Sequence, residues 1–186
     1  EAGDPELVEK FTILRDQVAR CKQALSVMSA SAGEIRAESG RFMPLDSYLD
    51  GVVASWQQQR PGAKLKYRKI GTIPTPGVLA ELTLTHALIN ILNNATDVSP
   101  RGIELHARWD RNSMTLRILD RGPGIAPAIS EQLGKAPITT KEQGLGVGLF
   151  LAFATINRLG GSIELLPRQD GKGTATHIIL PVVTQA

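Results

Sequence analysis

The chain has 186 residues and a formal net charge of +3, with 42% hydrophobic and 21% charged residues. These values indicate an ordinary globular protein with one core and an appendage. The basic residues are scattered rather than gathered in runs, so we expect no nucleic-acid partner. The lone cysteine excludes an internal disulfide framework. No apolar run approaches the ~18 residues of a membrane span, so we expect no membrane contact by this segment.

A seam of apolar residues runs through the first part of the chain, at alternating spacings of four and three residues. This heptad pattern predicts a helix of a coiled coil or bundle, and the alternative is an amphipathic helix lying on the following domain. Cys21 lies on the seam, either as a small core residue or as an intersubunit redox pair. A Ser-, Ala- and Gly-rich stretch up to Gly40 indicates a hinge. The seam residues are Leu7, Phe11, Leu14, Val18, Cys21, Leu25 and Met28.

Helical and strand patterns alternate over the rest of the chain. The stretch 122–144 shows no periodicity, and long structureless stretches in compact domains are usually functional loops. The patterns together predict an α/β sandwich over 41–186, in which a mostly antiparallel sheet is covered by helices on one face. The predicted helices span 45–58, 78–98 and 145–159, and the predicted strands span 64–69, 103–109, 114–119, 162–166 and 174–182.

A pair of asparagines lies within the long predicted helix. Asn90 and Asn94 are four residues apart, so both amides project from one face of the helix. An unpaired buried amide costs about 1–3 kcal/mol, and an amide oxygen is a hard, neutral ligand for Mg²⁺. Taken alone, the pair is better explained as two hydrogen-bonded core asparagines.

Two glycine-rich patterns follow. The first reads Asp120-Arg-Gly122-Pro-Gly124-Ile125 after a predicted strand; its carboxylate can accept the exocyclic amine of a purine, and its glycines let the backbone approach a flat ligand. A simple turn is the alternative. The second reads Gly144-Leu-Gly146-Val-Gly148-Leu149 and opens a predicted helix, where free backbone N–H groups suit phosphate. It matches neither the dinucleotide-binding GxGxxG nor the P-loop.

A last pattern, Gly171-Lys-Gly173-Thr174, is by itself a hairpin turn. In order and spacing, however, the four patterns together resemble the N, G1, G2 and terminal glycine boxes of the sensor histidine kinase ATPase domain. That domain belongs to the superfamily shared with gyrase, Hsp90 and MutL. The resemblance implies a Bergerat-type ATP-binding domain over 41–186. It also implies that 1–40 holds the second helix of the dimerisation and phosphotransfer bundle.

The resemblance also implies roles for individual residues. Asn94 would hold Mg²⁺ against the triphosphate of ATP, with Asn90 beside it. Asp120 would read the adenine amine, and Ile125 and Thr174 would line the base pocket.

The glycines Gly144, Gly146 and Gly148 would let a lid close on the phosphates, next to Leu149. Lys141 either contacts a phosphate or is a solvated loop lysine.

Two departures from the family pattern affect the expected chemistry. Many relatives carry a basic residue at the position of Asp97, which would therefore act through water or metal. Relatives that hydrolyse ATP place a glutamate at the position of Asn90, and an amide cannot take a proton from water at neutral pH. We therefore expect phosphoryl transfer rather than hydrolysis.

The phosphoacceptor motif of these kinases is absent, and His86, His106 and His177 do not match it. We expect the acceptor histidine on a bundle helix missing from this chain, with a response regulator as the next partner. Cys21 and the stretch ending at Lys141 also resemble the RegB/PrrB/RoxS redox-responsive subgroup. The resemblance thus implies the cytoplasmic portion of a homodimeric inner-membrane sensor kinase. A serine protein kinase and a non-catalytic, nucleotide-gated dimerisation module are the alternatives.

Overall fold

Alternating apolar and polar residues build the central sheet. The computed structural model describes residues 40–125 and 147–182. Within them, five strands form one sheet in the order β2-β4-β5-β7-β6. Ile103, Leu105 and Ala107 are buried and alternate with more exposed residues, as expected when one face of a sheet is covered. Neighbouring strands are antiparallel except β2 and β4, which are parallel. The strands are β2 (Leu65–Gly71), β4 (Ile103–Trp109), β5 (Ser113–Leu119), β6 (Ser162–Pro167) and β7 (Thr174–Pro181).

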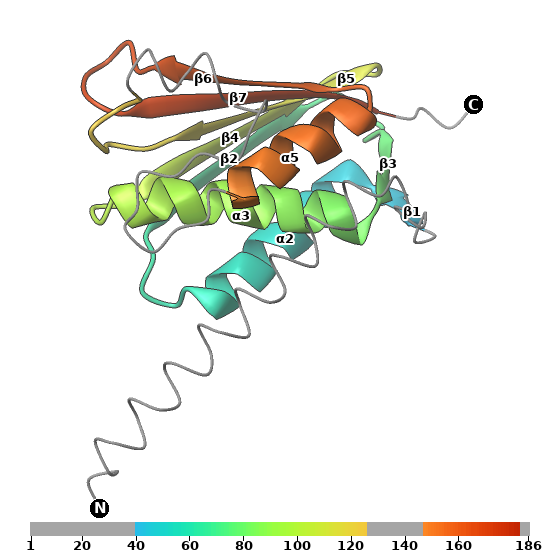
Figure 1. Cartoon of the computed structure of the whole chain (residues 1–186). Helices are drawn as coiled ribbons and strands as arrows, with labels where there is room; N and C mark the ends of the chain where they lie inside the picture. Colours follow the sequence, from blue (N-terminus) through green and yellow to red (C-terminus); the bar gives the residue numbers. More distant parts are fainter. Residues whose placement is uncertain (1–39, 126–146, 183–186) are drawn as a thin grey trace, which may run out of the picture. The chain divides into compact units, whose positions relative to one another are not determined.

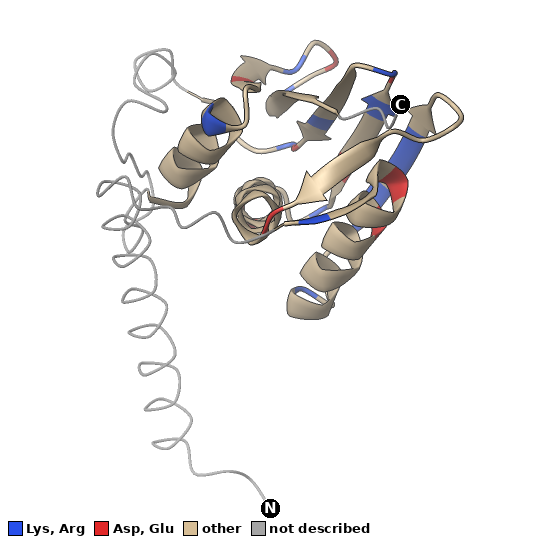
Figure 2. Ribbon diagram, turned by 90° about the vertical axis from the view of Figure 1, so that its right-hand side faces the viewer, with Lys and Arg blue, Asp and Glu red and all other residues tan. Residues whose placement is uncertain are grey.

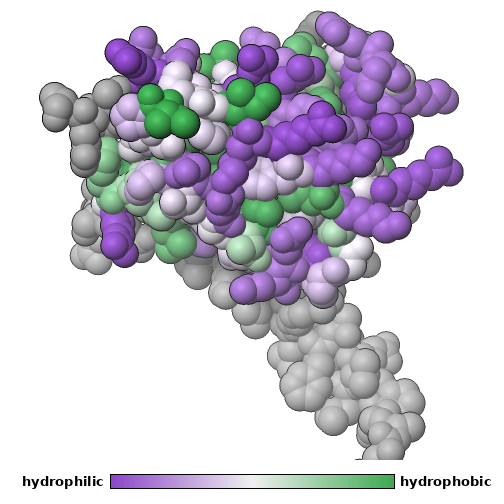
Figure 3. Space-filling view, turned by 180° about the vertical axis from the view of Figure 1, so that it is seen from behind, coloured by the Kyte–Doolittle hydropathy of each residue, from purple (hydrophilic) through white to green (hydrophobic). Residues whose placement is uncertain are grey.

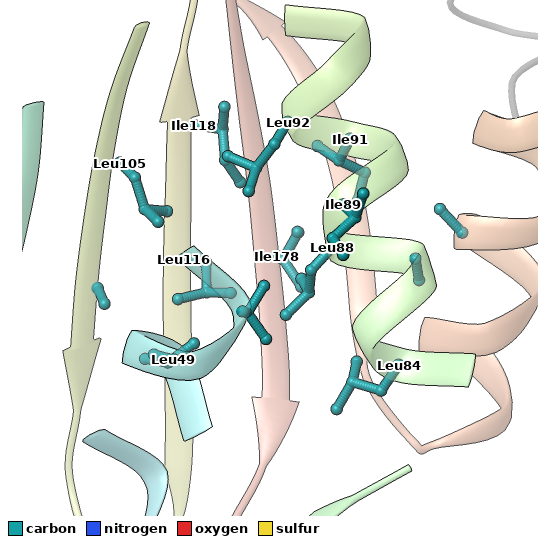
Figure 4. Packing of buried hydrophobic residues seen from close by; sticks show 14 of the residues in the cluster. Leu49, Leu84, Leu88, Ile89, Ile91, Leu92, Leu105, Leu116, Ile118 and Ile178 are labelled. Carbon is teal, nitrogen blue, oxygen red and sulfur yellow. The ribbon is translucent and has the colours of Figure 1, made fainter. Parts of the chain in front are cut away.

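Three helices cover one face of this sheet (Figure 1). They are α2 (Leu45–Gln59), α3 (Leu82–Val98) and α5 (Val147–Arg158). Figure 4 shows Leu88 and Leu92 of α3 directed toward the strands, in a single hydrophobic cluster that joins the helices to the sheet. Each fully buried leucine or isoleucine contributes about 1.5–3 kcal/mol. This cluster therefore fixes α3 against the strands and, with it, the polar residues that α3 carries.

One predicted boundary is wrong. The helix predicted over 78–98 begins at Leu82, and the residues before it form strand β3 (Gly77–Ala80). Strand β3 pairs antiparallel with β1 (Arg41–Pro44), which the sequence patterns did not indicate. The pairing depends on a close approach, since a Cβ on Gly77 would lie 1.8 Å from Cζ of Phe42. Partners so far apart in the sequence leave no local periodicity to detect.

The predicted fold class is confirmed: the chain forms an α/β sandwich with a mixed, mostly antiparallel sheet. All described residues belong to one compact unit, Ala37–Ala186. The predicted bundle helix, with Cys21, lies outside the described residues, and the predicted division near residue 40 stays a prediction. Within the described ranges, no helix combines the length and apolar character needed to cross a membrane.

Helix α3 is attached to α2 by a partly buried hydrogen bond. Nε1 of Trp56 donates to Oδ1 of Asn93 over 3.1 Å, and the Trp56 side chain is completely buried. An indole N–H in that position needs an acceptor, because an unpaired buried donor costs about 1–3 kcal/mol. Asn93 is therefore a structural residue, although it adjoins Asn94 in the sequence.

We predict that Asn93→Ala lowers the free energy of unfolding by about 1–3 kcal/mol, because the indole N–H of Trp56 loses its acceptor. Urea denaturation followed by tryptophan fluorescence measures the change. The matched control is Asn112→Ala at an exposed turn, where surface substitutions stay within about 0.5 kcal/mol. Equal effects of the two substitutions would contradict the structural role of Asn93.

Candidate functional site

The carboxylate of Asp120 lies directly after strand β5 and is the centre of the candidate site. Its side chain is buried, with 5% of the residue exposed. Oδ1 accepts hydrogen bonds from the backbone N–H of Gly122 at 2.8 Å and of Thr174 at 3.1 Å. Oδ2 receives no hydrogen bond from the residues that the structure describes. A carboxylate oxygen only accepts hydrogen bonds, so Oδ2 suits a ligand that brings an N–H group.

Two glycines allow the backbone to approach this carboxylate. Gly173 has a φ of +129°, and a Cβ on it would lie 2.1 Å from the carbonyl oxygen of Asp120. The backbone N–H of Asp120 also donates to the carbonyl of Thr174 at 3.0 Å. A Cβ on Gly122 would lie 2.7 Å from Cγ2 of Val98. The end of β5, the start of β7 and the end of α3 therefore meet around Asp120.

One stripe of helix α3 connects the predicted asparagine pair with both glycine patterns. Asn90 lies against the start of α5, because a Cβ on Gly148 would be 3.5 Å from Cγ of Asn90. Val98, eight residues later on the same stripe, contacts Gly122. Asn94 lies midway, about 6 Å along the helix axis from each. The structure thus places Asn94 between the start of α5 and the Asp120 loop.

Asp97 lies one turn beyond Asn93 on α3. It forms an ion pair with Nη1 of Arg60 at 3.0 Å, just beyond the end of α2. Asn93, four residues earlier, bonds to Trp56 of α2, so this part of α3 faces α2. The described ion pair therefore directs Asp97 toward Arg60, and its predicted role at the nucleotide stays a prediction.

A buried serine links the end of α3 to the Asp120 loop. Oγ of Ser99 donates to the carbonyl of Gly102 at 2.8 Å and accepts from the backbone N–H of Arg121 at 3.0 Å. Ser99 is 1% exposed. The sequence reasoning missed it, and the sequence offered only an ordinary turn signal in Ser99 and Pro100.

The reasoning from sequence also missed Arg168, in the turn between β6 and β7. Nη1 of Arg168 donates to the carbonyl of Asp120 at 3.2 Å, and its side chain is only 4% exposed. Its Nε donates to Oδ1 of Asp170 at 2.7 Å, and this hydrogen bond lowers the pKa of Asp170 to about 2. Nη2 of Arg168 lies 3.8 Å from Oε1 of Glu104. Arg168 thus fixes the backbone of Asp120 through the hydrogen bond to its carbonyl. No local sequence pattern indicated that the Arg168 side chain would be buried.

The remaining predicted residues divide into two groups. Gly124 has a φ of +86° that favours glycine, Ile125 is half-buried, and Leu149 packs partly against the hydrophobic core. Their predicted nucleotide contacts stay predictions. Lys141, Gly144 and Gly146 lie outside the described residues.

The donor chemistry around Asn94 fits a hydrated Mg²⁺ that arrives with phosphate. In the described part of the chain, no group of three or more His, Cys, Asp or Glu residues could hold a metal ion alone. An amide oxygen such as that of Asn94 could supply one oxygen ligand. Mg²⁺ usually takes few protein ligands and completes its shell with water and substrate phosphate oxygens. Asn94 thus fits the predicted role without a dedicated metal cage.

Residues 80–184 match the family model described as histidine kinase-, DNA gyrase B- and HSP90-like ATPase. The chain belongs to this ATPase family. Sporulation kinase E of Bacillus subtilis is 35% identical over 102 residues, which cover 53% of this chain and 14% of that protein. The sensor histidine kinase RegB of Cereibacter sphaeroides is 23% identical over 180 residues, which cover 89% of this chain and 38% of RegB. The predicted likeness to sensor histidine kinases, RegB included, is confirmed.

The fold of this ATPase-family chain is also found in solved histidine kinases. The crystal structure of full-length ShkA matches it with a TM-score of 0.71 at 22% identity, covering 98% of this chain and 40% of ShkA. At that identity the likeness shows the fold. The chain spans well under half the length of these relatives.

We predict that Gly173→Ala lowers the free energy of unfolding by about 1–3 kcal/mol more than Gly171→Ala, because its Cβ collides with the Asp120 carbonyl. Gly171 is a matched control: it has a φ of +145°, and nothing lies within 4 Å of its added Cβ. Urea denaturation of both variants measures the difference. Equal destabilisation would mean that backbone conformation alone, and not contact with Asp120, makes Gly173 necessary.

Proposed function

We propose that this chain is the ATP-binding catalytic part of a sensor histidine kinase, which transfers the γ-phosphoryl group to a histidine on a helix outside this chain. The observation that carries the proposal is the buried Asp120, whose Oδ1 is held by two backbone N–H groups. Membership of the ATPase family supports it. Further support comes from ShkA, whose full-length crystal structure is in complex with AMPPNP.

Adenine recognition follows from the two oxygens of Asp120. Because Oδ1 is occupied by Gly122 and Thr174, the carboxylate cannot rotate without losing both hydrogen bonds. Oδ2 is then the oxygen available to the exocyclic amine of adenine. Guanine carries a carbonyl oxygen at that ring position and would oppose the carboxylate. The nearby Ile125 and Thr174 would contact the base.

Phosphate binding follows from the stripe of α3. Asn94 would hold Mg²⁺, which neutralises phosphate charge when bound. Asn90 lies against Gly148 at the start of α5, so an anion near Asn90 would also lie near a helix N-terminus, which favours negative charge. The triphosphate would therefore extend from the Asp120 loop along α3 toward α5.

Asn90 favours transfer over hydrolysis. Hydrolysis needs a general base beside the attacking water, and a neutral amide cannot accept its proton. Transfer to an imidazole needs mainly positioning and charge neutralisation. His86, His106 and His177 do not match the phosphoacceptor motif, a histidine followed by Glu or Asp and soon by Pro. The acceptor would belong to a further helix of a homodimer and would pass phosphate to a response regulator.

We predict that Asp120→Asn weakens ATP binding by roughly tenfold to a hundredfold, as expected when a hydrogen bond to a charged group is lost. The asparagine oxygen can still accept from Gly122 and Thr174, so the fold should persist. Its NH₂ group, however, replaces Oδ2 and opposes the adenine amine. Isothermal titration calorimetry with Mg·ATP measures the affinity.

The control for that measurement is Asp50→Asn, the same change at an exposed aspartate paired with Lys69. It should bind ATP like the original chain. Unchanged affinity in Asp120→Asn, with circular dichroism showing an intact fold, would remove Asp120 from the base-reading role.

We predict that the whole chain, given Mg·ATP, phosphorylates a separate peptide that carries the first bundle helix of the full-length protein. The product should be an acid-labile phosphohistidine, detected with radiolabelled ATP before and after acid treatment. Acid-stable phosphoserine on a protein substrate would support the serine kinase instead. ATP binding without transfer would support the nucleotide-gated module, and release of phosphate without transfer would contradict the kinase function.

A further inference from the structure

The face of the central sheet opposite the helices gathers arginines that are far apart in the sequence. The strand register aligns Arg68 of β2 with His106 of β4, and His106 with Arg117 of β5. Arg108 lies in the next row, between Ile70 and Thr115. Adjacent strands are about 4.8 Å apart, so three guanidinium groups occupy an area about two strand spacings wide. Figure 2 shows lysine and arginine positions along these strands.

These three arginines lack acidic partners within the described chain. Arg68, Arg108 and Arg117 are exposed and form no ion pair or hydrogen bond there. Glu104, in the adjoining row, already lies within ion-pair distance of Arg121 and Arg168. Glu164 lies in the same row as Arg117 but two strands away, beyond His177.

The same row of the sheet continues from Arg117 through His177 of β7 to Glu164 of β6. Burial, together with the charge of Arg117, lowers the pKa of the neighbouring His177. Like charges at such spacing repel one another, so the cluster is not explained by the stability of the sheet.

The surface at this cluster is hollowed. A cavity of about 600 Å³ is lined by Arg108, Arg117 and Ile70, and a smaller one of about 180 Å³ shares these residues and adds Arg68. Because the two cavities share their lining, they form one groove across β2, β4 and β5. Ile70 is 65% exposed, so an apolar side chain lies among the arginines. Figure 3, seen from behind, shows hydrophilic side chains with small hydrophobic patches between them.

The chemistry of the groove favours an acidic protein segment over other anions. Arginine pairs with carboxylates in a bidentate manner, and the exposed Ile70 suits an aliphatic neighbour of those carboxylates. Single-stranded nucleic acid would need aromatic platforms. Among the described lining residues only Trp109 is aromatic, and it packs against Gly71 and the core. A flat membrane surface would not enter a groove.

One carboxylate also lines the groove. Oδ1 of Asp110 accepts the backbone N–H groups of Asn112 and Ser113, both at 2.8 Å, and these hydrogen bonds lower its pKa. The carboxylate of Asp110 therefore remains ionised, and its hydrogen bonds stabilise the hairpin turn between β4 and β5. With three arginines and this single carboxylate, the lining of the groove carries a net positive charge.

We propose that the groove formed by Arg68, Arg108, Arg117 and Ile70 is a docking site for an acidic segment of a partner protein, with carboxylates alternating with aliphatic side chains. The site lies on the opposite face of the sheet from the helices that carry Asn90 and Asn94. The docking proposal therefore shares no residue with the nucleotide site. The nucleotide site could fail its own tests without affecting this one.

The test uses the whole chain and a fluorescein-labelled peptide of alternating glutamate and leucine, followed by fluorescence anisotropy. We predict that the triple substitution Arg68→Gln, Arg108→Gln and Arg117→Gln weakens binding by roughly tenfold to a hundredfold, because charge-assisted hydrogen bonds are lost. Since no described residue loses a partner, the midpoint of urea denaturation should stay the same or rise. A second variant, Ile70→Ser, should weaken binding without any change in charge.

The matched control removes the same number of charges elsewhere, through Arg41→Gln, Lys64→Gln and Arg101→Gln, all at exposed positions outside the groove. It should bind the peptide like the original chain. Equal loss in both triple variants would reduce the effect to net charge and overturn the proposal. So would absence of binding, equal binding of a glutamine–leucine peptide, or stronger binding of an oligonucleotide or of phosphatidylserine vesicles.

Discussion

The polar side chains in the middle of helix α3 must find partners, because they lie in a helix that the core holds beneath a sheet. Individual side chains on this face of the helix meet this requirement differently. Asn93 and Asp97 face α2, where Trp56 and Arg60 supply the donors. Asn90 and Asn94 lie on the stripe that runs between Gly148 and the Asp120 loop. Helix α3 therefore supports the packing of the fold and also contributes side chains to the candidate site. Residues adjacent in its sequence, such as Asn93 and Asn94, have different roles.

The aspartate at the end of β5 depends on the same positioning. Val98 at the end of α3 contacts Gly122, and Ser99 bonds to the backbone of Arg121. From the other side, Arg168 holds the carbonyl of Asp120. The loop between these supports contains glycines, yet its position is fixed by long-range contacts. A ligand would thus meet a carboxylate whose orientation is set in advance, which reduces the entropy cost of binding.

Much of the fold could be predicted because the longer elements carry their own periodicity. Helix α2 and strand β4 begin where the patterns placed them, since buried and exposed residues alternate locally. Strands β1 and β3 could not be found, because each is four residues long and becomes a strand only by pairing with the other. The residues of the candidate site divide in the same way, into those marked by a local motif and those defined only by distant contacts. Local motifs indicated Asn90, Asn94 and Asp120, whereas Ser99 and Arg168 act through distant partners. The arginine groove was equally hidden, since the strand register brings together basic residues that appear scattered along the sequence.

The position of β5 in the sheet has a consequence for local unfolding. It is paired on one side with β4 and on the other with β7, so its backbone amides are protected along both edges, whereas β2 and β6 are the outer strands of the sheet within the described residues. Interior strands of this kind open most rarely, often only with global unfolding. Because Asp120 directly follows β5, its carboxylate is anchored to the slowest-opening part of the sheet. Fraying of the edge strand β2 would therefore leave Asp120 and its hydrogen bonds to Gly122 and Thr174 in place.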